Sequence, residues 1–461
     1  MYRLTYPLEK YDEQNLNKQE ILHLIHKHIA FNRKLLENKR YFDGKHAILD
    51  RKKSEGAPNN RLVCNHAADI VTTATSYFGG NPITYKSDYL IDSLLDAFEF
   101  ASVDDIDGDN IQDLSVYGLA YEYVYVKEKE TQPVSKTLTP LNTFMVHDDT
   151  IEENELFAVY YYAQKDDTDK TPTRYAATVL TANYKYVLSI LDNDEYQPVD
   201  ETPEKHFFGE IPVIEFQNNK DAKGDFEGVI PLMDAYNLLM SDRVDDKEQF
   251  IDSILAIYGT LLSDDNEESE AMKALKELGL LELPLGSKAE YITRTFNENE
   301  VEILKKAIEQ DIHKFSHIPC LSDESFAGNT SGVAMEYKLL GLENIAKIKS
   351  RYYRKGAKKR IRLYNNFLQI KGRGVDITGI TAIFTRGLPK NLLELSQIVA
   401  NLWGKVSKRT LLSQLPFVTD VNAELESIKK ESEEALQQQQ AMFGIGSNTP
   451  PEGGEDDAEE E

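Results

Sequence analysis

A helical pattern of apolar residues runs with little interruption from Ser331 to about Ile370, and it restricts the fold more than any other feature of the chain. An α-helix rises by about 1.5 Å per residue, so a helix of this length spans roughly 60 Å, more than the width of a small domain. We therefore expect this helix to form a spine, with Gly341 and Gly356 as candidate kink points.

The segment before the spine, SFAGNTSG, begins at Ser325 and consists mainly of small, polar and glycine residues. It has a faint similarity to a phosphate-binding loop, because glycine and hydroxyl residues precede a helix N-terminus that favours an anion. The Gly-Lys-Ser/Thr ending of a P-loop is absent, so this is not an NTPase signature. We interpret it as an exposed loop with Ser331 near the helix N-cap.

The charge balance limits how the chain can contact nucleic acid. Its 461 residues include 52 Lys and Arg against 78 Asp and Glu, a formal net charge of −26. A surface of this sign does not coat nucleic acid, so any contact with DNA must be local. The length allows roughly three domains, and an apolar content of 41% indicates that most of the chain is globular.

Cysteine usage and hydropathy both point to the cytoplasm. Cys64 and Cys320 lie far apart without metal-like spacing, so we interpret them as free thiols of a cytosolic protein. The N-terminus lacks the apolar core of a signal peptide, and no stretch approaches the ~20 apolar residues of a membrane helix. We expect the protein to be made and kept in the cytoplasm, without a membrane partner.

The first half of the chain predicts two helices and a sheet-rich module. Asn17 can cap a helix that continues to about Asn38, with Glu20 reaching back, and a second helix ends at Gly79. From Val116 to about Phe216, short β-branched and aromatic runs alternate with polar turns, which is typical of strands.

The second half predicts long helices. One covers Pro231–Gly259 and another Asn297–Ser316, and the insert between them carries a short helix near Ala271–Leu278 and strands in LLELPL and AEYITRT. After the spine we expect a strand in VDITGITAIFTRGLP, helices in NLLELSQIVANLWGK and SKRTLLSQLP, and disorder from about Gln437. The resulting fold class is α+β and mainly helical.

The spine carries a segregated block of positive charge. From Lys347 to Arg373 it contains eleven Lys and Arg and no Asp or Glu. This block faces either nucleic acid or the acidic residues of a neighbouring subunit, and the sequence does not favour one over the other.

Two groups of residues have a weak likeness to metal sites. His313 and His317 are four apart on a helix, but the Glu of a zinc protease motif is missing. The run HDDTIEENE, from His147 to Glu155, lacks the glycine and alternating ligands of a calcium loop. His23, His26 and His28 do not share one helix face. We therefore predict surface or interface histidines, a solvated turn, no metal and no cofactor.

Four motifs, in this order, resemble the portal proteins of tailed bacteriophages, in the branch typical of phages of Gram-positive hosts. They are NNRLVCNHAADIVTTATSYFGGNPITY, SVYGLAYEYVYV, GDFEGVIPLMDAYNLLMSDRVDDKEQF and SDESFAGNTSGVAMEYKLLGLENIAKIKSRYYRKG. The resemblance that they carry extends over most of the chain up to about Gly387, and none of the motifs is a catalytic signature.

The resemblance implies a dodecameric ring at one capsid vertex, through which double-stranded DNA is packaged and later ejected. It also implies a division of the chain into the following parts: wing, 1–228; stem helix, 229–258; clip, 259–296; second stem helix, 297–319; tunnel loop, 320–331; long wing helix and strand, 332–387; crown, 388–436; disordered acidic tail, 437–461. The crown is assigned by position alone, and neither the clip nor the tail has a motif that matches the family.

The resemblance also suggests site residues. The tunnel loop, which narrows the channel around DNA, would present Ser322, Asp323, Glu324, Ser325, Phe326, Asn329 and Thr330. Stem carboxylates would give the channel a wall that does not hold DNA, with the candidates Asp234, Asp242, Asp245, Asp246 and Asp252. The clip would dock partners through Asp264, Asp265, Glu267 and Glu268. On the spine helix, intersubunit pairing is then favoured for Lys347, Lys349, Arg351, Arg354, Lys358 and Arg360.

The implied partners are other copies of the chain, double-stranded DNA, the terminase large subunit, the major capsid and scaffolding proteins, and a head-completion or adaptor protein. The protein would be a non-enzymatic part of the virion, at the capsid vertex, assembled in the host bacterial cytoplasm. Two alternatives stay open at this point: a metal-dependent phage hydrolase or nuclease, and a scaffold that never contacts DNA.

Overall fold

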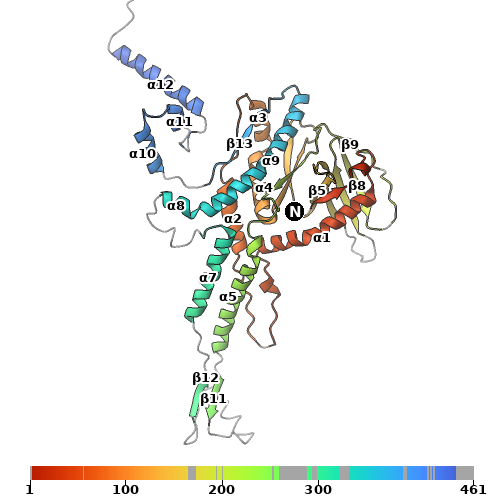
Figure 1. Cartoon of the computed structure of the whole chain (residues 1–461), viewed down its shortest axis with the longest axis vertical. Coiled ribbons are helices and arrows are strands. Elements are labelled where there is room, and N and C mark those ends of the chain that lie inside the picture. Colours follow the sequence, from red (N-terminus) through yellow and green to blue (C-terminus); the bar gives the residue numbers. More distant parts are fainter. Residues whose placement is uncertain are drawn as a thin grey trace, which may run out of the picture. The chain divides into compact units, whose positions relative to one another are not determined.

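The computed structural model describes residues 3–55, 57–164, 173–193, 195–199, 201–251, 254–258, 288–292, 298–320, 332–387, 392–412, 415, 418 and 421–442. The chain divides into two compact units, 1–387 and 388–461, which are described separately (Figure 1). Within the described ranges, helices accompany sheets of six, three, two and two strands. The predicted α+β, mainly helical class is confirmed.

In the larger unit, α1 (Lys18–Phe42) packs along a sheet. Its N-cap is Asn17, as predicted, because the Asn17 side chain accepts a hydrogen bond from the backbone N–H of Gln19. The sheet has the order β1-β5-β6-β7-β8-β9. Its strands are β1 (Leu4–Tyr6), β5 (Thr143–Asp148), β6 (Glu155–Gln164), β7 (Arg174–Leu180), β8 (Tyr184–Leu191) and β9 (Glu204–Lys205). All neighbours are antiparallel except β1 and β5.

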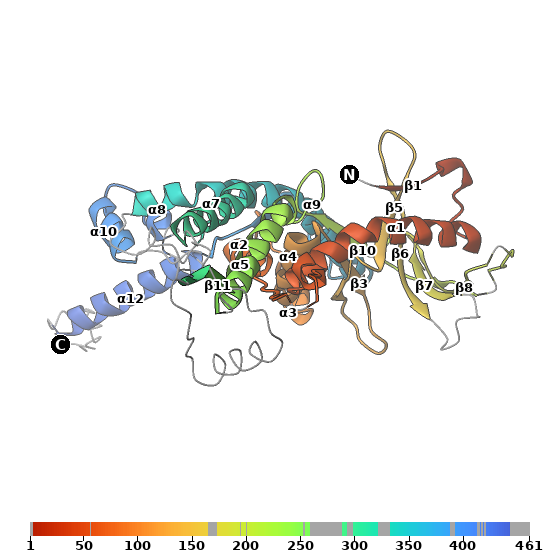
Figure 2. The same cartoon turned by 90° about the horizontal axis from the view of Figure 1, so that it is seen from below.

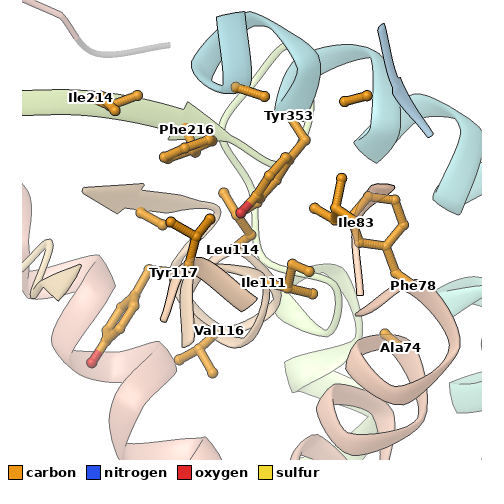
Figure 3. Close-up of a cluster of buried hydrophobic side chains, with 14 of the residues drawn as sticks. Ala74, Phe78, Ile83, Ile111, Leu114, Val116, Tyr117, Ile214, Phe216 and Tyr353 are labelled. Carbon is orange, nitrogen blue, oxygen red and sulfur yellow. The ribbon is translucent and has the colours of Figure 1, made fainter. Parts of the chain in front are cut away.

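A second, three-stranded sheet lies beside a group of helices. Its order is β10-β3-β4, and its strands are β3 (Leu119–Tyr125), β4 (Val134–Leu138) and β10 (Val213–Gln217). The helices around it are α2 (His66–Gly79), α3 (Asp92–Phe100), α4 (Val103–Tyr117) and the spine. The helix predicted to end at Gly79 is confirmed, whereas α3 and α4 were not predicted. Figure 3 shows the shared core, in which Phe216, Tyr353 and Phe78 lie close together.

The spine is two helices rather than one. The segments are α8 (Gly332–Lys338) and α9 (Leu340–Ile370), and they meet at Leu339. The helix passes through Gly356 without interruption, and this glycine serves close packing instead: a Cβ at this position would lie 2.4 Å from ring carbons of Phe216. No break in α9 therefore marks the candidate kink point at Gly356.

Two helices leave the core together and form a stem. They are α5 (Ile230–Ile251) and α7 (Glu298–Ser316), which lie side by side in Figures 1 and 2 and contact each other. The sequence predicted a helix to Gly259, but the chain changes to strand β11 (Ile254–Tyr258), which pairs antiparallel with β12 (Lys288–Ile292). The run ILAIY is rich in residues that favour strands. The other insert elements lie outside the described residues.

Short elements complete the larger unit. The 3₁₀ helices are η1 (Leu8–Lys10), η2 (Ala47–Asp50) and η3 (Glu227–Val229). A two-stranded sheet pairs β2 (Thr84–Lys86) with β13 (Thr381–Ile383), so the strand predicted after the spine exists but is short.

The smaller unit contains α10 (Leu392–Leu402), α11 (Lys408–Leu412) and α12 (Val421–Met442). The first two match predicted helices. Disorder was expected from Gln437, but α12 continues through the glutamine run to Met442, consistent with the good helix propensity of glutamine. In the described parts of both units, no helix is long and apolar enough to cross a membrane.

Candidate functional site

Three cations of the basic block, Lys349, Lys359 and Arg360, are buried inside the subunit. The ammonium of Lys349 lies 2.8 Å from a carboxylate oxygen of Asp225 and 2.8 Å from the hydroxyl of Ser115. Only 2% of the Lys349 side chain and 3% of the Asp225 side chain are exposed. The predicted availability of Lys349 to DNA or to a neighbouring subunit is therefore wrong.

Arg360 is buried still more completely. Its Nε lies 3.0 Å from both carboxylate oxygens of Glu122, and an Nη lies 2.6 Å from Asp107. Burial raises the pKa of Asp107, although the positive charge of Arg360 opposes this shift. Arg360 therefore pairs within the subunit. The prediction that it contacts DNA or a neighbouring subunit is wrong, as it is for Lys349.

Other cations of the block divide between internal and exposed positions. Lys359 donates to the carbonyl oxygen of Val213 at 2.7 Å and contacts Glu155. Arg362 pairs with Glu210 at 2.8 Å on the surface. The remaining predicted spine residues, Lys347, Arg351, Arg354 and Lys358, are exposed.

The stem carboxylates are also partly engaged. Asp234 accepts a hydrogen bond of 2.7 Å from the hydroxyl of Tyr41. Asp242 contacts Arg51 and lies 3.3 Å from the ammonium of Lys53. Asp246 is half-buried, and Asp252 lies outside the described residues.

Asp245 is the centre of an ion cluster between α5 and the segment that follows η2. It accepts hydrogen bonds from Lys53 at 2.6 Å, from the backbone N–H of Asn60 at 2.7 Å and from Arg51 at 3.2 Å. Burial alone would raise the pKa of Asp245, but the bonds from Lys53 and Asn60 outweigh it and lower the pKa to about 2. Its side chain is 1% exposed, so its predicted place on a channel wall does not fit its burial.

These partners were not predicted from the sequence. One signal was present, because Arg51, Lys52 and Lys53 form a basic triplet in an acidic chain that also contains an acidic helix. Pairing between two such distant segments follows only from the tertiary structure.

The histidine pair does not form a metal site. The Nδ1 of His313 lies 3.0 Å from the carbonyl oxygen of Ile318, and its side chain is buried. His317 is exposed and adopts a left-handed backbone conformation with φ 59° beyond the end of α7. Across the described ranges, no group of three or more His, Cys, Asp or Glu is placed to hold a metal ion.

The run from His147 to Glu155 is a turn closed by its own side chains. Asp148 accepts hydrogen bonds from the hydroxyl of Thr150 at 2.7 Å and from the amide of Asn154 at 3.0 Å. These bonds lower the pKa of Asp148. Its carboxylate is thus satisfied by donors of the turn. Cys64 is a free thiol, as predicted.

The predicted tunnel-loop residues Ser322, Asp323, Glu324, Ser325, Phe326, Asn329 and Thr330 lie outside the described residues. The clip residues Asp264, Asp265, Glu267 and Glu268 do so as well. Both assignments stay predictions.

The described geometry defines a structural class: a mixed α/β body from which two packed helices leave as a stem, accompanied by a two-stranded antiparallel sheet of β11 and β12. Residues 21–438 match the family of phage portal proteins of the SPP1 Gp6-like type. The chain belongs to this family, and the resemblance found in the sequence motifs is confirmed.

Curated relatives agree with this assignment. The chain is 25% identical over 456 residues to the portal protein of Bacillus phage SPP1, covering 92% of this chain and 85% of that protein. It is 26% identical over 286 residues to the portal protein of Clostridium phage phiCD119, covering 58% and 60% of the two chains. Among solved structures, a chain in the neck of a native gene transfer agent particle, computed with C12 symmetry, matches with a TM-score of 0.45 and 11% identity, over 76% of this chain and 88% of that chain.

Proposed function

We propose that twelve copies of this chain form a ring at one vertex of a phage capsid, and that double-stranded DNA passes through the ring during packaging and ejection. The observation that carries this proposal is the family match over residues 21–438. The paired helices α5 and α7 support it, because a bundle of such stems around one axis encloses a channel.

In this function the chain is a conduit and not an enzyme. No phosphate-binding motif occurs in the sequence, so the free energy for DNA translocation would come from a separate ATPase, the terminase. The segment from Ser322 to Thr330 would narrow the channel. Small and polar side chains at this position would let DNA slide past without tight binding. The carboxylates of Asp323 and Glu324 would also repel the phosphates of the DNA.

The same ring would serve as a docking platform. The acidic residues Asp264, Asp265, Glu267 and Glu268 would meet the terminase during packaging and a head-completion protein afterwards, while the body would contact the capsid. The protein would accordingly reside in the virion after assembly with scaffolding proteins in the host cytoplasm.

Native mass spectrometry of the purified chain, checked by negative-stain images, tests the ring. We expect closed rings of about a dozen subunits with a central hole. A chain that stays monomeric at high concentration would contradict autonomous ring formation, and stoichiometric binding of a divalent cation in calorimetry would favour the hydrolase alternative.

Two variants test the channel and the platform separately. Shortening Ser325–Thr330 should leave ring assembly intact and impair packaging or retention of DNA. Reversal of Asp264, Asp265, Glu267 and Glu268 to Lys should weaken terminase binding without affecting the ring. Normal packaging by the first variant, or unchanged terminase binding by the second, would contradict the respective assignment.

A further inference from the structure

One side of the larger unit carries an acidic surface, here called the acidic face. Between Lys86 and Lys127 the chain has ten Asp or Glu and no Lys, Arg or His. The exposed carboxylates on α3 and α4 that define the acidic face are Asp92, Asp96, Glu99, Asp104, Asp105 and Asp109. In the described part of the chain, none of the six forms an ion pair.

The acidic face also exposes large apolar side chains. On α3, Asp92, Asp96 and Glu99 recur at helical spacing on the side opposite to the buried Leu94 and Phe98. Within or beside this stripe, Leu95 is 38% exposed, Phe100 is 50% exposed and Leu90 is 85% exposed. Unpaired charges of one sign around apolar side chains are typical of a surface that another macromolecule covers.

A surface of opposite charge lies between α9 and the loop that follows β10, and we call it the basic cleft. Four exposed cations line it: Lys220, Lys223, Arg351 and Lys355. Asp221 is the single acidic residue in its lining, and Ile348 and Tyr352 give it an apolar floor. The cleft has a volume of about 690 Å³.

The loop that carries the two lysines is held in place before any partner binds. The side-chain amide of Asn218 donates to the carbonyl oxygen of Lys223 at 2.9 Å and to Asp225 at 2.7 Å. The side-chain oxygen Oδ1 of Asn219 accepts hydrogen bonds from the backbone N–H groups of Asp221 and Lys223, each at 3.1 Å. Because the loop is already ordered, binding of a partner costs little conformational entropy.

The two surfaces lie on different sides of the molecule. In Figure 2, α9 and α3 lie on opposite sides of α4. The basic cleft opens where α9 packs against the end of β10, whereas α3 approaches α9 near the sheet of β2 and β13, through the contact of Phe98 with Tyr364 at 4.9 Å between ring centroids.

We propose that the basic cleft of one subunit binds the acidic face of the next subunit in the ring. A closed cyclic ring has a heterologous interface, so each subunit must carry two different surfaces that complement each other. The acidic face and the basic cleft form such a pair, because their charges are opposite and both expose apolar side chains. This inference rests on the proposed ring and specifies which surfaces close it. DNA is the other polyanion that could occupy the cleft, but it would leave the acidic face uncovered.

Charge reversal tests this interface. The first variant combines Lys220→Glu, Lys223→Glu and Arg351→Glu, which makes both surfaces acidic. The second combines Asp96→Lys, Glu99→Lys and Asp109→Lys, which makes both surfaces basic, and none of these three positions is in the first turn of a helix. We expect each variant alone to form at least about tenfold fewer rings than the unmodified chain, since like charges then face each other.

The decisive experiment mixes the two variants. In the mixture every interface between unlike subunits is again complementary, so rings should return with the two variants in equal number. Mass spectrometry of subunits released from the isolated rings identifies this ratio from the two subunit masses. The chain that carries all six substitutions should also form rings. Restoration excludes misfolding as the reason for the single-variant losses. A matched control reverses Lys27 and Arg33, exposed residues of α1, and should assemble normally.

Several results would overturn the interface. Normal rings from both single variants would do so, as would losses that neither the mixture nor the six-substitution chain restores. Normal rings with impaired DNA retention by the first variant would assign the basic cleft to DNA instead. If the unmodified chain forms no rings, the proposed function fails first and the interface fails with it.

Discussion

Arg360 and Glu122 are 238 residues apart in the sequence, yet they form a fully buried bidentate ion pair between α9 and β3. Neither side chain is exposed to solvent. The guanidinium also reaches Asp107 on α4, so one spine residue connects three elements of the core. Displacement of α9 would leave these buried charges without partners, which is strongly unfavourable.

Removal of this charge should destabilise the body strongly. Arg360→Met leaves two carboxylates buried without a counter-charge, and we expect a loss of about 3–5 kcal/mol in the free energy of unfolding. Arg362→Met, two residues along the same helix, breaks only the surface pair with Glu210 and should cost less than about 1 kcal/mol. Thermal unfolding of both variants measures the difference, and equal melting temperatures would contradict the assigned role of Arg360.

Replacement of Gly356 by alanine should lower the stability of the fold, whereas the same replacement in an exposed helix raises it. Alanine normally stabilises a helix interior by about 1 kcal/mol relative to glycine. At Gly356 the new Cβ would meet the Phe216 ring at 2.4 Å, so we expect a net destabilisation of about 1–3 kcal/mol. Gly108 in α4 is the matched control, because its Cβ would have no neighbour within 4 Å. Gly108→Ala should stabilise, and a stabilising Gly356→Ala would refute the close packing.

The sequence predicted those parts of the fold that depend on local patterns. The Asn17 cap, the end of α2 at Gly79 and the helix before Pro319 all follow from signals within a few residues. The end of α5 was missed because ILAIY fits both a helix and a strand, and its pairing with β12 decides the outcome. The partners of Lys349 and Arg360 depend on contacts more than 100 residues distant, which periodicity does not encode.

Site prediction from the sequence had the same limit. The excess of cations on α9 was evident, but only the fold separates the buried Lys349 from the exposed Arg351 on the same helix. The acidic face was overlooked because α3 and α4 were not predicted. The sequence does show one signal for this face, because no Lys, Arg or His occurs between Lys86 and Lys127.

Acidification should destabilise the six-stranded sheet through His28. Burial lowers the pKa of His28 to about 4, even though a backbone hydrogen bond from its ring to Pro140 opposes the shift. The folded state therefore keeps this ring neutral, and protonation favours the unfolded chain as the pH falls from about 6.5 toward 4. We expect a loss of about 2 kcal/mol between pH 7 and pH 5.

His28→Gln provides the test, because it removes the titration while keeping a polar group near the hydroxyl of Tyr161. Urea unfolding of both proteins at pH 7 and pH 5 should show the smaller pH dependence in the variant. An equal loss of stability in the two proteins would assign the acid sensitivity to other groups.

The ion cluster around Asp245 should hold the segment from Arg51 to Asn60 against the stem. Asp245→Asn removes the charge that Arg51 and Lys53 share, and charge-assisted hydrogen bonds contribute about 1.5–3 kcal/mol. Since about 1.4 kcal/mol corresponds to a factor of ten, trypsin should cleave after Arg51 or Lys53 at least about tenfold faster. Asp246→Asn, at the neighbouring half-buried position, should leave the cleavage rate unchanged.

Because the cluster is internal to one subunit, the Asp245→Asn chain should still assemble like the unmodified chain. Equal cleavage rates in the two variants would show that the segment is held by its backbone contacts alone.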